Sequence, residues 1–70
     1  MTEAEIVAAI EARRVAIGWS VAKLAREAGM WQPNVSRLLS GSRASPQLET
    51  ILRLAAAMDL EVTLTDAPRD

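Results

Sequence analysis

The side chains with the most specific chemistry in this chain lie close together between residues 32 and 37. An arginine can donate two parallel hydrogen bonds to guanine O6 and N7, and a glutamine or asparagine can pair with adenine N6 and N7. Arg37, Gln32 and Asn34 have these groups, and Ser36 adds a hydroxyl. Pro33 adds an apolar surface that suits a thymine methyl group. The expected chemistry is therefore recognition of base-pair edges by Gln32, Pro33, Asn34, Ser36 and Arg37, and the alternative is an ordinary solvated polar face.

Catalytic chemistry has little support in the composition. The chain has no His and no Cys, so it has no base for a Ser-His or Cys-His nucleophile and lacks the usual zinc ligands. Its 70 residues are also too few to surround a substrate. We therefore expect no catalytic residues, no metal and no cofactor. No apolar run reaches the roughly 18 residues of a membrane span, and no signal-peptide pattern opens the chain, so a cytosolic protein is expected.

The formal net charge of -1 conceals a segregation of charge along the chain. Residues 1–12 and 54–70 each have a charge of -3, whereas residues 13–53 have seven Lys and Arg against two Glu and therefore a charge of +5. A basic middle between acidic ends indicates one positive face, although ordinary surface charge could also fall this way.

Capping residues and glycines divide the chain into four predicted helices. Thr2 and Glu5 fit a capping box and Gly18 fits a C-terminal stop, which predicts a helix over 3–17. Ser20 is a good N-cap, Trp19 and Leu24 occupy hydrophobic-staple positions, and Gly29 is a stop, which predicts a helix over 21–28.

The third predicted helix begins near Trp31 or Gln32 and ends at Gly41. Pro33 is tolerated in a first turn, but a residue before proline is pushed away from helical geometry, so either Trp31 or Gln32 can be the N-cap. Val35, Leu38 and Leu39 form its expected buried face. Two short helices joined by a glycine turn, at 21–39, fit the helix-turn-helix pattern, whose second helix enters the major groove of DNA. A small alanine-rich helical hairpin is the alternative.

The fourth helix is predicted over 46–58, with Ser45 as N-cap and Pro46 as the first helical residue. Its apolar spacing follows Leu48, Ile51, Leu52, Ala55 and Met58. After Asp59 the period changes to two, and the alternation over 60–65 predicts a short strand. A fifth short helix or an unstructured tail is the alternative for these residues.

A chain of this length buries only about 60–65% of its unfolded surface, so it is marginal alone. Because disulfides are impossible and a zinc site is not expected, oligomerisation is the expected support. A lone strand also needs a partner for its backbone groups. Both arguments predict a homodimer in which the strands of two copies pair and bury Leu60, Val62 and Leu64.

The segment from Val21 to Gly41 resembles the Cro/phage-repressor (XRE-like) helix-turn-helix family. The resemblance covers about residues 6–64 and implies a compact all-α, four-helix domain, formed by the single domain 1–70, that binds DNA as a dimeric transcriptional regulator. Members that end in a short strand resemble the antitoxins of toxin–antitoxin operons. The chain departs from the family pattern in three ways: Val21 replaces a frequent Gln, Trp31 replaces a usual Ser or Thr, and the strand replaces the fifth helix of many phage repressors.

Residues at helix ends and loops around the third helix suit phosphate contacts, which position a protein on DNA without reading sequence. They are Ser20, Lys23, Trp31, Ser40, Ser42 and Arg43. The alternative role for the Trp31 side chain is to cover the second helix. Arg37 also has an alternative, which is an ion pair with a carboxylate such as Glu49.

The expected function is that of a homodimeric repressor that binds a palindromic operator in double-stranded DNA. A phage-type regulator and the autoregulator of a toxin–antitoxin operon are not distinguished by these residues. An antitoxin would also bind a toxin protein, through the acidic ends or the exposed alanine face of the first helix. The alternative class is a protein-interaction module that has the helix-turn-helix shape without DNA binding.

Overall fold

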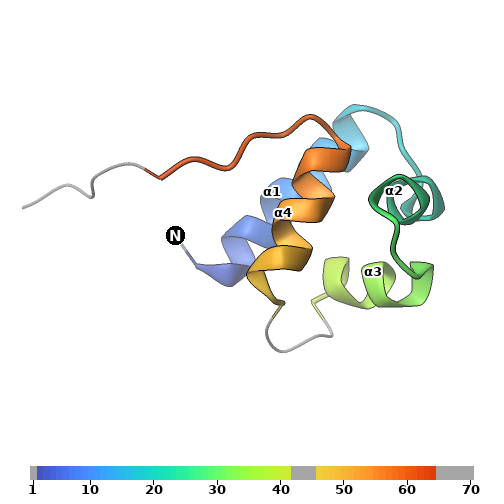
Figure 1. Ribbon diagram of the computed structural model, residues 1–70, viewed down its shortest axis with the longest axis horizontal. Helices are drawn as coiled ribbons and strands as arrows, with labels where there is room; N and C mark the ends of the chain where they lie inside the picture. The colour runs from blue at the N-terminus through green and yellow to red at the C-terminus, as the bar shows by residue number, and fades with distance from the viewer. Residues whose placement is uncertain (1, 42–45, 65–70) are drawn as a thin grey trace, which may run out of the picture.

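Four helices follow one another along the chain: α1 (Glu3–Ala16), α2 (Val21–Ala28), α3 (Gln32–Leu39) and α4 (Leu48–Ala57). The structure is a computed structural model, and it describes residues 2–41 and 46–64. α1 and α4 pack side by side, and α2 and α3 lie together to one side of them (Figure 1). The all-helical prediction is confirmed for the described part of the chain. No described helix is long and apolar enough to cross a membrane.

The ends of the first two helices follow the capping signals. The hydroxyl of Thr2 accepts a hydrogen bond from the backbone N–H of Glu5 at 3.1 Å, and that of Ser20 accepts one from Lys23 at 3.0 Å. These bonds satisfy N–H groups that have no partner within the helix. Gly18 and Gly29 have φ values of +73° and +68°, the left-handed geometry that ends a helix at low cost for glycine. The predicted helix over 21–28 is confirmed, and α1 ends one residue earlier than predicted.

α3 begins at Gln32, with Trp31 as its N-cap. Trp31 has extended backbone angles, and its side chain makes no capping hydrogen bond. Its carbonyl oxygen instead accepts the N–H groups of Asn34 and Val35. Pro33 lies in the first turn, where the missing N–H costs nothing. This resolves the choice between Trp31 and Gln32 as the N-cap in favour of Trp31.

The predicted start of the fourth helix at Pro46 is wrong. Gln47 is the N-cap of α4, with ψ of 147°, so Pro46 precedes the helix. The carbonyl oxygen of Gln47 accepts the N–H of Ile51, which fixes Leu48 as the first helical residue. Ser45 lies outside the described residues. At the other end Met58 is the C-cap, so the helix also stops one residue short of the prediction.

The core lies where the four helices meet. α2 packs on α3 and α4, and α1 packs on the same two helices. The side chains of Leu24, Val35 and Leu54 have no exposed surface. The other buried core residues are Ile10, Ala25, Ala28, Leu38, Ile51, Ala55 and Met58.

The predicted apolar face of the fourth helix is wrong at two positions. Leu48 and Leu52 are 68% and 44% exposed, whereas Leu54, which the spacing omitted, is fully buried. The helix therefore presents Ile51, Leu54 and Ala55 to the core. The reason is geometric. Apolar residues cover a wider arc of α4 than its neighbours can bury, and α1 and α2 pack against the side of α4 that includes Leu54.

Asp59 turns the chain out of α4 with a φ of +55°, which makes it the one non-glycine residue with positive φ in the described chain. The N–H of Leu60 then bonds to the carbonyl oxygen of Ala55 at 2.8 Å, and its side chain packs against the core. Residues 61–64 are exposed and extend away from the helices, and the described residues contain no strand (Figure 1). The predicted strand over 60–65 is thus not seen in one copy, and Thr65 lies outside the described residues.

Candidate nucleic-acid interface

α3 divides its side chains between the core and solvent. Val35 and Leu38 are buried and fix the helix against α1 and α2. Gln32, Pro33, Ser36 and Arg37 are exposed, and Asn34 is half-buried. The structure therefore brings the five predicted base-contact residues together on one short helix, with its apolar side turned inward.

Arg37 lies along its own helix. Its Nε donates to the carbonyl oxygen of Pro33 at 3.3 Å, and its Nη2 donates to the Oδ1 of Asn34 at 2.8 Å. The alternative of an ion pair with Glu49 is wrong, because Glu49 pairs with Arg53 at 3.0 Å. The Asn34 amide thus holds the guanidinium on the exposed surface of α3, and the hydrogen bonds of Arg37 to other described residues leave donor capacity for an external acceptor.

Trp31 projects from the start of α3 and is 66% exposed. A side chain that covered α2 would be largely buried, so the structure does not support that alternative. Trp19 differs, because it packs against the core as the staple prediction requires. The Nζ of Lys23 lies 5.0 Å from the centre of the Trp19 ring, within the range of a cation–π interaction.

The structure describes some, but not all, of the residues predicted to contact phosphates. Ser20 and Trp31 lie at the two helix starts and are exposed. Lys23 lies in the first turn of α2, and Ser40 follows α3, where its Oγ donates to the carbonyl oxygen of Arg37 at 3.0 Å. Ser42 and Arg43 lie outside the described residues.

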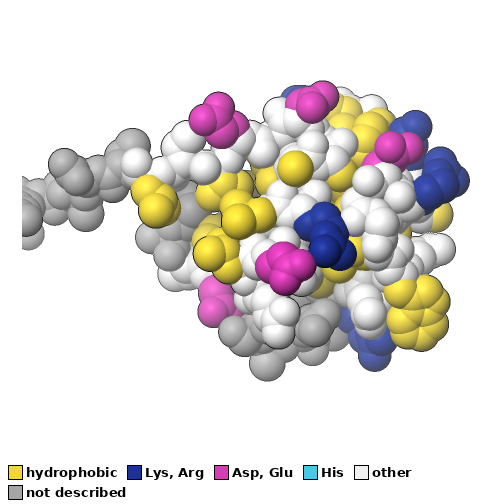
Figure 2. All heavy atoms as spheres, viewed as in Figure 1, with side chains coloured by type: hydrophobic (Ala, Val, Ile, Leu, Met, Phe, Trp, Pro, Cys, Tyr) yellow, Lys and Arg dark blue, Asp and Glu magenta, His cyan; other side chains and the backbone are white. Residues whose placement is uncertain are grey.

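Charge is distributed unevenly over the surface. Several Lys and Arg side chains appear on the side of the molecule where α2 and α3 lie, whereas acidic side chains dominate toward the extended C-terminal segment (Figure 2). This agrees with the positive charge of residues 13–53. A basic side attracts a polyanion and orients it toward α2 and α3.

Comparison with known families settles the class of this site. A family model described as helix-turn-helix matches residues 10–64, which begin within α1 and include α2, α3 and α4. The chain belongs to the Cro/phage-repressor (XRE-like) helix-turn-helix family. Proteins of this family are DNA-binding transcription regulators rather than enzymes, and the protein is accordingly a DNA-binding regulator. No curated protein and no solved structure matches the chain.

Two arginines that position the helix-turn-helix domain were not singled out by sequence reasoning. Arg14 donates to the carbonyl oxygen of Trp19 at 2.6 Å and forms an ion pair with Glu11, and the hydrogen bonds that Arg14 donates to the Glu11 carboxylate raise the pKa of Arg14 above its usual range. Arg13 donates to the carbonyl oxygen of Met58. Both lie in the last turn of α1, a place that indicates a helix end but does not indicate which carbonyl oxygens they bind.

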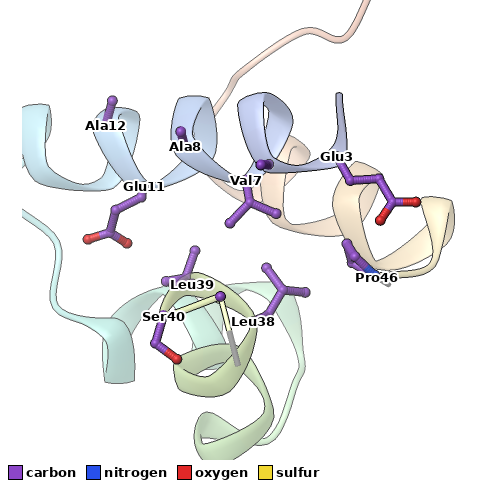
Figure 3. A pocket seen from close by; sticks show the side chains of 11 residues that line it. Glu3, Val7, Ala8, Glu11, Ala12, Leu38, Leu39, Ser40 and Pro46 are labelled. Atoms are coloured by element: carbon purple, nitrogen blue, oxygen red, sulfur yellow. The ribbon is translucent and has the colours of Figure 1, made fainter. Parts of the chain in front are cut away.

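A groove of about 700 Å³ lies between α1 and the end of α3 in this domain. Figure 3 shows Val7 and Ala8 of α1 above Leu38 and Leu39 of α3, with Glu11 at one end of the α1 side. The groove has an apolar floor with acidic side chains from α1. It includes part of the alanine face that sequence analysis singled out for a protein partner. The residues that line it are Glu3, Ala4, Val7, Ala8, Glu11, Ala12, Leu38, Leu39, Ser40, Gly41 and Pro46.

Proposed function

We propose that the protein is a homodimeric, sequence-specific repressor that binds a palindromic operator in double-stranded DNA. The observation that carries the proposal is the division of α3, in which Val35 and Leu38 are buried while Gln32 and Arg37 are exposed. A helix that is held this way presents one row of hydrogen-bonding side chains to a major groove.

Base contacts are assigned to five residues of α3. Arg37 is suited to guanine, and Gln32 or Asn34 to adenine, each worth about 1–3 kcal/mol of discrimination. Because Asn34 already bonds to Arg37, the two side chains are coupled, and DNA must either keep or replace that bond. Pro33 and Ser36 complete the row of Gln32, Pro33, Asn34, Ser36 and Arg37.

Phosphate contacts are assigned to the flanking residues. The first turns of α2 and α3 offer backbone N–H groups, and Ser20, Lys23 and Trp31 lie at those turns. Ser40, Ser42 and Arg43 follow α3 in the chain. These contacts position the domain and supply the salt-dependent part of the affinity.

Two copies are proposed to act together, with the C-terminal segments pairing through Leu60, Val62 and Leu64. The support is that Val62 and Leu64 are 45% and 97% exposed in one copy, on an extended segment whose backbone groups lack a sheet partner among the described residues. A chain that ends at Leu60 tests this pairing, because Leu60 itself packs on the core. If the shortened chain dimerises as tightly as the full chain over a range of concentrations in light scattering, strand pairing is wrong.

The DNA-binding proposal is tested by titrating labelled duplexes with the protein at several salt concentrations. We expect the wild type to bind duplex DNA with an affinity that falls steeply with salt, since phosphate contacts release counterions. We expect Arg37→Ala to reduce the difference between specific and random duplexes. No measurable binding to any duplex at low salt would contradict the proposal.

A second candidate function is supported by the groove between α1 and α3. An antitoxin-type regulator also binds a toxin protein, and the acidic and alanine-rich side of α1 offers a surface for one. A module that acts only through a protein partner would leave duplex DNA unbound. The salt titration therefore distinguishes such a module from a DNA-binding regulator, whereas an antitoxin-type regulator is expected to bind duplex DNA as well.

A further inference from the structure

α4 exposes an apolar stripe that its own domain does not use. Leu48 and Leu52 lie one helical turn apart and are 68% and 44% exposed. The buried side of the same helix is formed by other residues, among them Ile51 and Leu54. Leucines four residues apart on an exposed face form a short ridge of the kind that packs against another helix.

A charged stripe runs beside this apolar ridge. Glu49 and Arg53 are also four residues apart, and the Oε1 of Glu49 accepts a hydrogen bond from the Nη2 of Arg53 at 3.0 Å. Their side chains are 76% and 49% exposed. Figure 2 shows an acidic and a basic side chain next to exposed hydrophobic side chains over the region where Figure 1 draws α4.

The two stripes are self-complementary under a two-fold rotation. An axis perpendicular to α4 near its Thr50–Ile51 bond would set two α4 helices antiparallel. Leu48 of each copy would then face Leu52 of the other, and the acidic Glu49 of each would face the basic Arg53 of the other. A surface that matches itself in this way is what an isologous dimer requires.

We propose that the Leu48–Arg53 face of α4 is an interface between two copies of this chain. The self-matching charges select this occupant, because a partner surface of a single charge sign would meet a like charge at either Glu49 or Arg53. The interface lies on a different helix from the reading residues of α3. The inference rests on the proposed homodimer and gives it a helical contact in addition to the C-terminal segments.

The test is the dimer dissociation constant of the full chain, measured by sedimentation velocity over a range of concentrations. Glu49→Arg places like charges together at two symmetric positions, so we expect the constant to rise about tenfold or more. Arg53→Glu should do the same, and the double variant Glu49→Arg with Arg53→Glu should restore the wild-type value. Leu52→Glu should also weaken the dimer, whereas Val15→Glu is the matched control at an exposed apolar site on α1.

Each outcome decides one part of the account. Weaker dimers in the single variants with recovery in the double variant, and an unchanged control, support the interface. A wild-type dimer that none of the α4 variants alters would overturn this inference and leave the proposed function standing. A wild-type chain that is monomeric at all concentrations would contradict both. Circular dichroism of each variant checks that the helices are retained.

Discussion

Arg13 in α1 donates two hydrogen bonds to the backbone carbonyl oxygen of Met58 at the end of α4. The Nε atom lies 3.2 Å and the Nη2 atom 3.1 Å from that oxygen, across 45 positions of sequence. A cation at a helix C-terminus is favourable because the last carbonyl groups have no partner within the helix. This contact joins the first helix to the last and fixes the point from which the C-terminal segment leaves the domain.

Loss of this contact is expected to destabilise the domain. Arg13→Ala removes a charged donor from a partly buried carbonyl, so we expect the free energy of unfolding to fall by about 1–2 kcal/mol. Urea denaturation at one fixed protein concentration measures it. Arg26→Ala, at an exposed position of α2, is the matched control and should change the value by less than about 0.5 kcal/mol. Equal decreases in the free energy of unfolding of the two variants would show that the bond from Arg13 to Met58 does not stabilise the domain more than an exposed arginine does.

The turn between α2 and α3 depends on Gly29. Its φ of +68° is unfavourable for residues with a Cβ, although a methyl group at this position would meet no described residue other than its own chain neighbours within 4 Å. Gly29→Ala should therefore cost about 1–2 kcal/mol of stability through backbone strain alone. Gly29→Asn should cost less, since asparagine tolerates this region. Thermal unfolding of the two variants checks the order, and a more stable alanine variant would contradict it.

Base contacts and phosphate contacts predict different losses. Arg37→Ala should relax base preference at one position of each half-site, by about 1–3 kcal/mol. Arg43→Ala should weaken binding to all sequences alike and lower the salt slope by about one. Competition between specific and random duplexes at several salt concentrations measures both effects. If the two variants lose affinity equally for specific and random duplexes, the division of roles is wrong.

Trp31 is expected to contact DNA without supporting the fold. Because its side chain is 66% exposed, Trp31→Ala should change stability by less than about 0.5 kcal/mol. The affinity of the Trp31→Ala variant for duplex DNA should fall by about fivefold or more, because exposed aromatic residues often contribute strongly at interfaces. In the Trp19→Phe variant Trp31 is the only tryptophan, and its fluorescence should change on addition of duplex. Unchanged fluorescence at saturating DNA would contradict the contact.

Local signals were sufficient for the elements around the reading helix. Ser20 and Gly29 cap the two ends of α2, as predicted, because capping hydrogen bonds and positive φ values depend on only a few neighbouring residues. The buried positions of Val35 and Leu38 also followed from helical spacing. These same signals placed Gln32 and Arg37 on the exposed side.

Features that depend on long-range packing were not predictable. The apolar spacing of the last helix assigned Leu48 and Leu52 to the core, because a sequence pattern does not show how wide an arc the neighbouring helices cover. The bond from Arg13 to Met58 joins distant segments, and nothing in the local pattern of either indicates it. The Asn34–Arg37 bond was not predicted either: the sequence indicated a base contact for Arg37, with an ion pair to a carboxylate such as Glu49 as the alternative.

Selection of bound duplexes from a random pool tests the central claim most directly. If two copies of α3 read one operator, the enriched sequences should share a palindrome whose half-sites are about 34 Å apart, one turn of DNA. The same selection with Arg37→Ala should lose one base of each half-site. Recovery of no common sequence, or of a single unrepeated site, would contradict a dimeric and sequence-specific regulator.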